Sequence, residues 1–215
     1  MVQSELMIDY ASGALPEPVA LAMATHISLS PAARDAYAQL NALGGMMLEA
    51  LDDDGALSDD ALDDVLQRLD APEPVAPSVP DLDDRTRAIV PGPLQRYLPA
   101  SLDSLPWKQV IRGVKEYRFE TTVDGYKTAL IRVAPGRPMP RHSHRGPEYT
   151  VILDGAYDDD DGMRLERGDI CEAQPADNHQ PVADPETGCI CLIVLDAPLK
   201  LSGFLGTVIN PFLKT

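Results

Sequence analysis

The stretch of sequence that decides the fold is GRPMPRHSHRGPEYTVILDG, residues 136–155. Side chains two positions apart along a strand face the same side, so we expect His142 and His144 to project together. Glu148 follows a short turn and begins the next predicted strand, close enough to join the two imidazoles. Imidazoles and carboxylates are ligands for transition metals, so this stretch predicts a metal site.

A second stretch completes the candidate ligand set. It is GDICEAQPADNH, residues 168–179, and its last residue is a third histidine, His179. Three imidazoles and one carboxylate suit Zn, Fe, Ni or Mn, and residue type alone does not separate these metals. The sequence therefore predicts one divalent transition metal, with zinc favoured, and the ligands His142, His144, Glu148 and His179.

The residues around these motifs read as short strands between turns that contain Gly and Pro. The β-rich runs are 110–117, 126–133, 149–153, 169–173 and 189–195. Many short strands over ~110 residues indicate an antiparallel sandwich or barrel. We interpret the acidic run 158–161, between two strands, as a solvated hairpin tip rather than a calcium site.

Before the strands, the chain reads as helices. Ser30 is expected to cap one of them, with Pro31 at the first helical position, where its missing N–H costs nothing. Apolar residues from Tyr37 to Leu51 recur at three- and four-residue spacing, which predicts an amphipathic stripe. We expect a small bundle whose exposed apolar surface is completed by a partner. The predicted helices are 4–11, 17–29, a segment from Pro31 and a segment after Ser58.

Negative charge is concentrated in this helical region. Residues 1–70 hold thirteen acids and two bases, and so carry most of the formal net charge of −16. That surplus argues against direct binding of nucleic acid or an anionic membrane. It either keeps a small helical domain soluble or suits a protein partner with a basic surface. With no apolar run near the ~20 residues that span a bilayer, and no secretion signal, we expect a cytoplasmic protein.

A proline-rich stretch separates the helices from the strands. Its proline density is incompatible with a packed element, so we interpret it as a linker. The predicted organisation is a helical domain of residues 1–70, a Pro- and Asp-rich linker of residues 71–92, and a metal-binding domain of residues 93–215.

The two histidine motifs resemble the signature motifs of the cupin superfamily, a double-stranded β-helix or jelly-roll barrel with a metal in its mouth. The first motif is complete. In the second, Gln174 and Ala176 stand where the family has Pro and Gly, and His179 is in register. The resemblance implies a two-domain α plus β fold, with a small N-terminal helical bundle and a C-terminal cupin.

Nearly the whole chain resembles the ChrR anti-sigma factors, from the acidic helical module and linker through HSHRGPEYTVILDG to CICLIVLDAPLKLSGFLG. The resemblance implies that the helical domain binds and inhibits an extracytoplasmic-function sigma factor, while the cupin senses oxidants such as singlet oxygen. It implies a regulator and not an enzyme. A metal-dependent cupin dioxygenase or isomerase is the alternative, because the same ligands with open positions serve those reactions. A homodimer through the cupin is left open.

The N-terminal region departs from the family pattern. His26 matches the histidine of a zinc-binding His-xxx-Cys-xx-Cys motif, but Ser30 and Ala33 occupy the two cysteine positions. One imidazole does not hold a structural zinc. We therefore expect these helices to fold without zinc, and we interpret His26 as a residual helix residue.

The cysteines give no disulfide framework, because there are three and all lie late in the chain. Cys189 and Cys191 are two apart in a predicted strand and so face one side. We interpret them as small buried hydrophobes rather than a redox pair. Cys171 precedes His179 and could approach the metal site.

Overall fold

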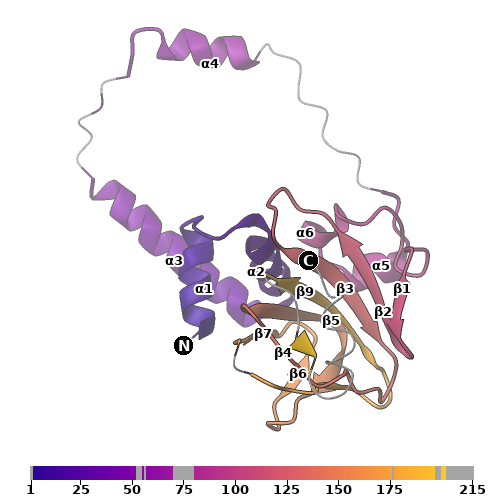
Figure 1. The fold of residues 1–215 in the computed structure, drawn as a ribbon. Helices are drawn as coiled ribbons and strands as arrows, with labels where there is room; N and C mark the ends of the chain where they lie inside the picture. The colour runs from indigo at the N-terminus through magenta and orange to yellow at the C-terminus, as the bar shows by residue number, and fades with distance from the viewer. Residues whose placement is uncertain are drawn as a thin grey trace.

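The computed structural model describes residues 2–51, 55, 57–69, 80–175, 177–196 and 200–201. Helices come first along the chain and strands follow (Figure 1). The helices are α1 (Val2–Ala11), α2 (Glu17–Leu29), α3 (Pro31–Glu49), α4 (Ala61–Leu69), α5 (Asp84–Ile89) and α6 (Gly92–Gln95). The strands are β1 (Lys108–Ile111), β2 (Val114–Phe119), β3 (Lys127–Val133), β4 (His142–Ser143), β5 (Glu148–Asp158), β6 (Arg164–Glu166), β7 (Ile170–Ala173), β8 (Val182–Ala183), β9 (Cys189–Leu195) and β10 (Lys200–Leu201).

Side-chain caps fix the starts of two helices. The Ser30 hydroxyl accepts a hydrogen bond from the backbone N–H of Ala33 at 3.3 Å, and α3 begins with Pro31, as predicted. Asp83 caps α5 in the same way, accepting from the N–H of Thr86 at 2.6 Å. Each cap satisfies an N–H that has no partner within the first turn of its helix.

Residues 80–92, which fall within the predicted linker, are packed against the rest of the protein. They contain α5, and Leu82 and Val90 beside it are only 2% and 0% exposed. The hydroxyl of Thr86 accepts a 2.9 Å hydrogen bond from the N–H of Leu102, which ties α5 to the chain that follows. The prolines of residues 71–79 lie outside the described residues.

The strands form a strongly curved antiparallel sheet of the predicted cupin type (Figure 1). Its order is β1-β2-β3-β9-β5-β6, and β7 and β8 also pair with β5. The central strand is β9, in which Leu192 lies opposite Leu130 of β3 on one side and Val151 of β5 on the other. Strands β3, β7 and β9 match the predicted runs to within one residue.

Two strands differ from the predicted runs because glycines change the path of the chain. The predicted run 110–117 is a hairpin of β1 and β2, which turns at Gly113 with φ of +83°. Strand β5 extends past the predicted 153 to Asp158 through Gly155, whose φ is +70°. A Cβ at Gly155 would lie 2.1 Å from the carbonyl oxygen of Gly188. Only glycine fits there.

Strand β9 separates two apolar clusters. All seven of its residues are buried, and they alternate between the two sides as a strand requires. Ile190, Leu192 and Val194 belong to a cluster shared with the helices. The other cluster fills the inside of the curved sheet, and β9 contributes Cys189, Cys191, Ile193 and Leu195 to it.

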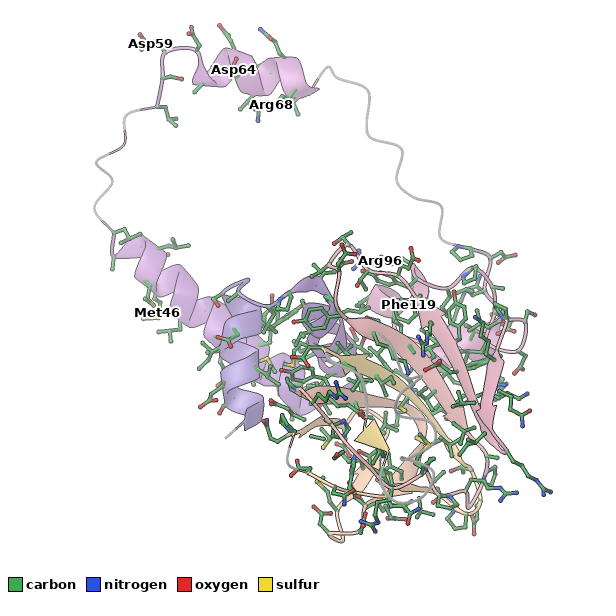
Figure 2. All side chains as sticks on the ribbon, viewed as in Figure 1. Met46, Asp59, Asp64, Arg68, Arg96 and Phe119 are labelled. Atoms are coloured by element: carbon green, nitrogen blue, oxygen red, sulfur yellow. The ribbon has the colours of Figure 1, made fainter. Side chains whose placement is uncertain are left out.

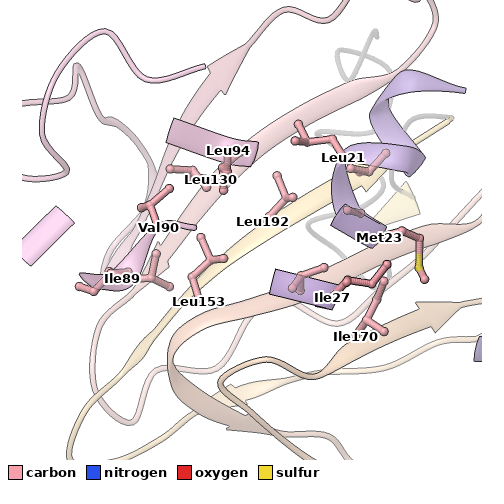
Figure 3. Close-up of a cluster of buried hydrophobic side chains, with 14 of the residues drawn as sticks. Leu21, Met23, Ile27, Ile89, Val90, Leu94, Leu130, Leu153, Ile170 and Leu192 are labelled. Atoms are coloured by element: carbon pink, nitrogen blue, oxygen red, sulfur yellow. The ribbon is translucent and has the colours of Figure 1, made fainter. Parts of the chain in front are cut away.

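Helix α2 packs directly on the sheet, so the N-terminal helices do not form a separate bundle core. Leu21, Met23 and Ile27 lie in the same cluster as Leu153 and Leu192 of the sheet (Figure 3). Met23 is 1% exposed. Helices α1 and α3 pack in turn against α2, whereas no residue of α4 is buried and the helix stands apart (Figure 1).

Candidate functional site

Three of the four predicted ligands come together. His142 lies in β4, His144 is two residues later, and the backbone of His179 exchanges hydrogen bonds of 3.1 and 3.0 Å with that of His142. One nitrogen from each ring lies within 4.8 Å of the others. The Nε2 atoms of His144 and His179 are 3.1 Å apart. Two nitrogens on one tetrahedral zinc at ~2.0–2.1 Å are about 3.3 Å apart. The cluster therefore fits a single transition metal ion.

Hydrogen bonds orient two of the three rings. Nδ1 of His142 lies 2.8 Å from the carbonyl oxygen of Pro140, and Nδ1 of His179 lies 2.6 Å from a carboxylate oxygen of Asp159. Both oxygens are acceptors, so each Nδ1 carries the proton and each Nε2 keeps a free lone pair. That tautomer presents Nε2 as the metal-binding atom.

Glu148, the fourth predicted ligand, lies beside the cluster. It is the first residue of β5, and its Oε2 is 3.2 Å from Nδ1 of His144. That nitrogen is the one opposite to the Nε2 that faces His179. The other oxygen of Glu148 accepts a 2.9 Å hydrogen bond from the hydroxyl of Thr150. The structure thus places Glu148 within reach of His144 and not among the three converging nitrogens.

Burial favours the uncharged form of the first two imidazoles. Removal from water lowers the pKa of His142 and of His144, and this outweighs the nearby charge of Glu148, which acts in the opposite direction. Neutral imidazole is the form that binds a metal.

The cluster opens into a cavity of about 110 Å³ inside the curved sheet. His142, Glu148 and His179 line part of it, and most of the remaining lining is apolar. Glu116 and Lys127, which form an ion pair, also line this cavity. It therefore combines candidate metal ligands with an apolar wall.

The cysteines are free thiols. Cys189 and Cys191 both line the cavity and are buried, so they face one side as predicted. The hydrogen bond with Cys189, together with burial, raises the pKa of Cys191 well above its usual value. Burial raises the pKa of Cys171 to about 11. Thiolates are the reactive and metal-binding form, so none of these observations favours a cysteine ligand.

A second candidate site is the apolar surface of α3 and α4. The first half of α3 packs on the core through Tyr37 and Leu40, whereas its second half projects away from the other helices (Figure 2, near Met46). Its large apolar side chains there are 53–70% exposed; they are Leu43, Met46, Met47 and Leu48, followed by Leu51. Exposed apolar residues of α4 are Leu62, Val65, Leu66 and Leu69. We call these nine residues the apolar helix surface.

Acidic side chains accompany this surface. Asp63 and Asp64 lie in the first turn of α4, Asp59 and Asp60 precede it, and Figure 2 shows Asp59 and Asp64 directed away from the helix axis. Exposed apolar side chains bordered by polar groups are typical of a protein interaction site, and α4 combines both on one short helix.

The interpretation of His26 as a residual helix residue is wrong. The residue is 8% exposed, and its Nδ1 lies 2.6 Å from the carbonyl oxygen of Gly168, which precedes β7. Glu17, at the other end of α2, accepts 2.6 Å hydrogen bonds from the Tyr97 hydroxyl and the Thr122 N–H. Both residues join α2 to the chain beyond residue 80, and no local pattern signals either contact. The described residues contain no cluster of metal-ligating side chains near His26.

None of the helices in the described ranges has the length and apolar character to cross a membrane.

Comparisons with known proteins match the cupin region in one case and nearly the whole chain in another. The model of the ChrR cupin-like domain matches residues 97–198. The anti-sigma-E factor ChrR of Cereibacter sphaeroides is 34% identical over 217 residues, covering 99% of this chain and 97% of that protein. The chain belongs to the ChrR family of anti-sigma factors.

A solved ChrR structure has the same architecture. The crystal structure of Rhodobacter sphaeroides SigE in complex with the anti-sigma ChrR matches with a TM-score of 0.75 and 33% identity, over 90% of this chain and 96% of that one. The predicted ChrR arrangement of N-terminal helices and C-terminal cupin is confirmed. Membership of the ChrR family makes the chain a regulator rather than a cupin enzyme.

Proposed function

We propose that this protein is an anti-sigma factor that binds and inhibits an extracytoplasmic-function sigma factor through its N-terminal helices. The observation that carries the proposal is the apolar helix surface, which is exposed in a chain whose ChrR relative is in complex with SigE. Burying such side chains stabilises a complex by ~25 cal/mol per Å² of apolar area before association costs are subtracted.

The acidic charge of the helical region supports the same partner. A sigma factor binds DNA and therefore presents basic surfaces. Residues 1–70, with thirteen acids and two bases, complement such a surface. Helices bound there occupy the area that DNA or polymerase needs, and inhibition follows from that occlusion. A sigma factor acts in the cytoplasm, so a cytoplasmic location is part of the proposal.

The cupin holds one divalent transition metal, with zinc favoured, through His142, His144 and His179. The carboxylate of Glu148 lies 3.2 Å from the His144 ring and supplies the fourth ligand when it turns from that ring toward the ion. The converging ring nitrogens and the neutral state of the buried imidazoles support this assignment. A bound metal would cross-link the segments that carry the ligands. The cupin senses oxidative signals such as singlet oxygen, and the cavity beside the histidines supports this role because it leaves room next to them.

The sigma-binding proposal is tested by placing charge on the apolar helix surface of the full-length chain. Met47 and Leu48 are 65% and 70% exposed, so Met47→Asp with Leu48→Asp leaves the core intact. Titration calorimetry against the sigma factor encoded nearest to this chain should show at least tenfold weaker binding. Val110→Asp, at a 57% exposed position of β1, is the matched control and should bind as the unmodified chain does. Equal binding by the double variant would contradict the proposal.

The metal assignment is tested by elemental analysis. The purified chain should contain about one transition metal ion, and His142→Ala with His144→Ala should remove it. Full occupancy in that double variant would contradict the assignment. The homodimer remains a prediction, which light scattering of the full chain tests.

A further inference from the structure

The acidic run at residues 158–161 lies at the hairpin between β5 and β6 with Asp158, Asp160 and Asp161 exposed, as predicted, but Asp159 departs from that prediction. Asp159 begins the turn between β5 and β6, which the N–H of Asp159 closes by donating to the carbonyl of Met163 at 2.8 Å. The side chain of Asp159 is only 8% exposed, and its Oδ2 lies 2.6 Å from Nδ1 of His179. One carboxylate of the run is therefore turned inward, onto a ring of the histidine cluster.

The next residue holds the same turn against both ligand-bearing segments. Asp160 accepts a 2.6 Å hydrogen bond from the N–H of Gln180, next to His179. Its other oxygen pairs with the guanidinium of Arg141, next to His142. Arg141 also donates to the carbonyl of Asn178 at 3.1 Å. The turn thus joins the segment that carries His142 to the segment that carries His179.

We propose that Asp159 is a positioning residue for the metal centre: its carboxylate holds the His179 ring so that Nε2 faces His142 and His144. The inference rests on the metal site of the proposed function. A carboxylate that accepts from the second nitrogen of a ligating histidine fixes the tautomer and orientation of the ring and raises its basicity. Without Asp159, the ring of His179 loses the hydrogen bond that sets its rotation. The other polar contacts of the residue are two backbone hydrogen bonds with His142, which do not involve the ring, and the approach of Nε2 to Nε2 of His144.

The test compares variants of the full-length chain by zinc affinity, measured in competition with a chromophoric chelator. Asp159→Ala should weaken zinc binding by about 10–100-fold. Asp159→Asn, whose amide oxygen still accepts from Nδ1, should recover part of that loss. Asp161→Ala is the matched control, because Asp161 lies in the same turn and accepts from the N–H of Met163. It should bind zinc within about twofold of the unmodified chain, well short of the loss expected at a ligand-orienting residue.

The visible absorption spectrum of the cobalt-substituted protein separates positioning from a general loss of structure. Its d–d bands report the ligand field, so Asp159→Ala should shift them while Asp161→Ala and Asp159→Asn keep them close to those of the unmodified protein. Unchanged affinity and an unchanged cobalt spectrum in Asp159→Ala, in a protein that loses metal with His142→Ala and His144→Ala, would overturn this inference alone. An unmodified chain that binds neither zinc nor cobalt would overturn the metal site as well.

Discussion

The Nδ1 atom of His26 lies 2.6 Å from the carbonyl oxygen of Gly168, across 142 residues of sequence. The ring belongs to α2 and the carbonyl precedes β7, so this hydrogen bond fastens the N-terminal helices to the cupin. In the motif that the sequence resembles, the position of His26 is that of a zinc ligand. In this protein its ring is instead hydrogen-bonded to a backbone carbonyl.

Loss of this hydrogen bond should destabilise the whole chain. His26→Ala leaves a buried carbonyl without its partner and should lower the free energy of unfolding by about 1–3 kcal/mol. Urea denaturation followed by circular dichroism measures the change. The control is Ser28→Ala, which removes only a 2.7 Å bond to Ala24 within the same helix and should change stability by less than about 0.5 kcal/mol. Equal effects of the two variants would show that the Gly168 contact contributes nothing.

The shared core predicts that helices and cupin unfold together. Met23 is 1% exposed between α2 and the sheet, so Met23→Ala should cost about 2–5 kcal/mol. The only tryptophan, Trp107, reports on the cupin by fluorescence, and circular dichroism at 222 nm reports on the helices. The two signals should shift to lower urea concentration by the same amount. Met46→Ala, at a 67% exposed position, should leave both unchanged. A shift of the helical signal alone would contradict the shared core.

Glu116 should make stability depend on acid pH. Burial alone would raise the pKa of Glu116, but its bonds to Lys127 and Arg118 hold that pKa below its ordinary value. A lowered pKa in the folded state means that the carboxylate stabilises the protein above pH ~4.3, and that this contribution is lost as the pH falls through the folded pKa. Glu116→Gln should therefore cost about 1–3 kcal/mol at pH 7 and progressively less below pH 4.

Thermal unfolding at a series of pH values measures the difference in free energy of unfolding between Glu116→Gln and the unmodified chain. The exposed Glu120 on the same stretch of chain supplies the control, since Glu120→Gln should show a small difference that does not vary with pH. If the difference in free energy of unfolding between Glu116→Gln and the unmodified chain stays constant from pH 7 to pH 3, the ion pair is not its cause.

Salt should slow the association with the sigma factor more than it changes dissociation. In the proposed complex the acids of residues 1–70 would steer a basic partner, and exposed charges are screened beyond ~8 Å at physiological ionic strength. Dissociation depends mainly on the apolar helix surface. Stopped-flow measurements from 0.05 to 0.5 M salt should show a falling association rate constant, and Asp63→Asn with Asp64→Asn should flatten that dependence. A salt effect confined to dissociation would contradict steering.

The sequence predicted what local spacing encodes. The three histidines, the cap at Ser30 and the strand 189–195 all follow from patterns within a few residues or from a motif. The contacts that it did not predict join distant segments: His26 with Gly168, and Asp159 with His179. An acidic run looks the same in sequence whether its carboxylates face water or an imidazole, and only the folded chain decides between them.

The composition of the linker also concealed structure. Residues 80–92 look like a continuation of the proline-rich stretch, but Leu82 and Val90 pack in the same apolar cluster as residues of the sheet. This packing outweighs the low helix propensity around them.

The position of Glu148 was also only partly predicted, because the spacing placed it near His144 without specifying which ring nitrogen its carboxylate would face.

Because side chains alternate along β9, the register of this one strand sets both the surface under α2 and the lining of the cavity. Leu192 supports α2 from one side while Cys191 borders the cavity beside the histidines from the other. Shifting this strand by a single residue would exchange the two sets, placing Cys189 and Cys191 under the helix and Leu192 on the side of the cavity. We therefore expect insertions and deletions near Gly188 to damage the proposed sigma-factor binding and the proposed metal binding at once, even though neither surface contains the altered residue.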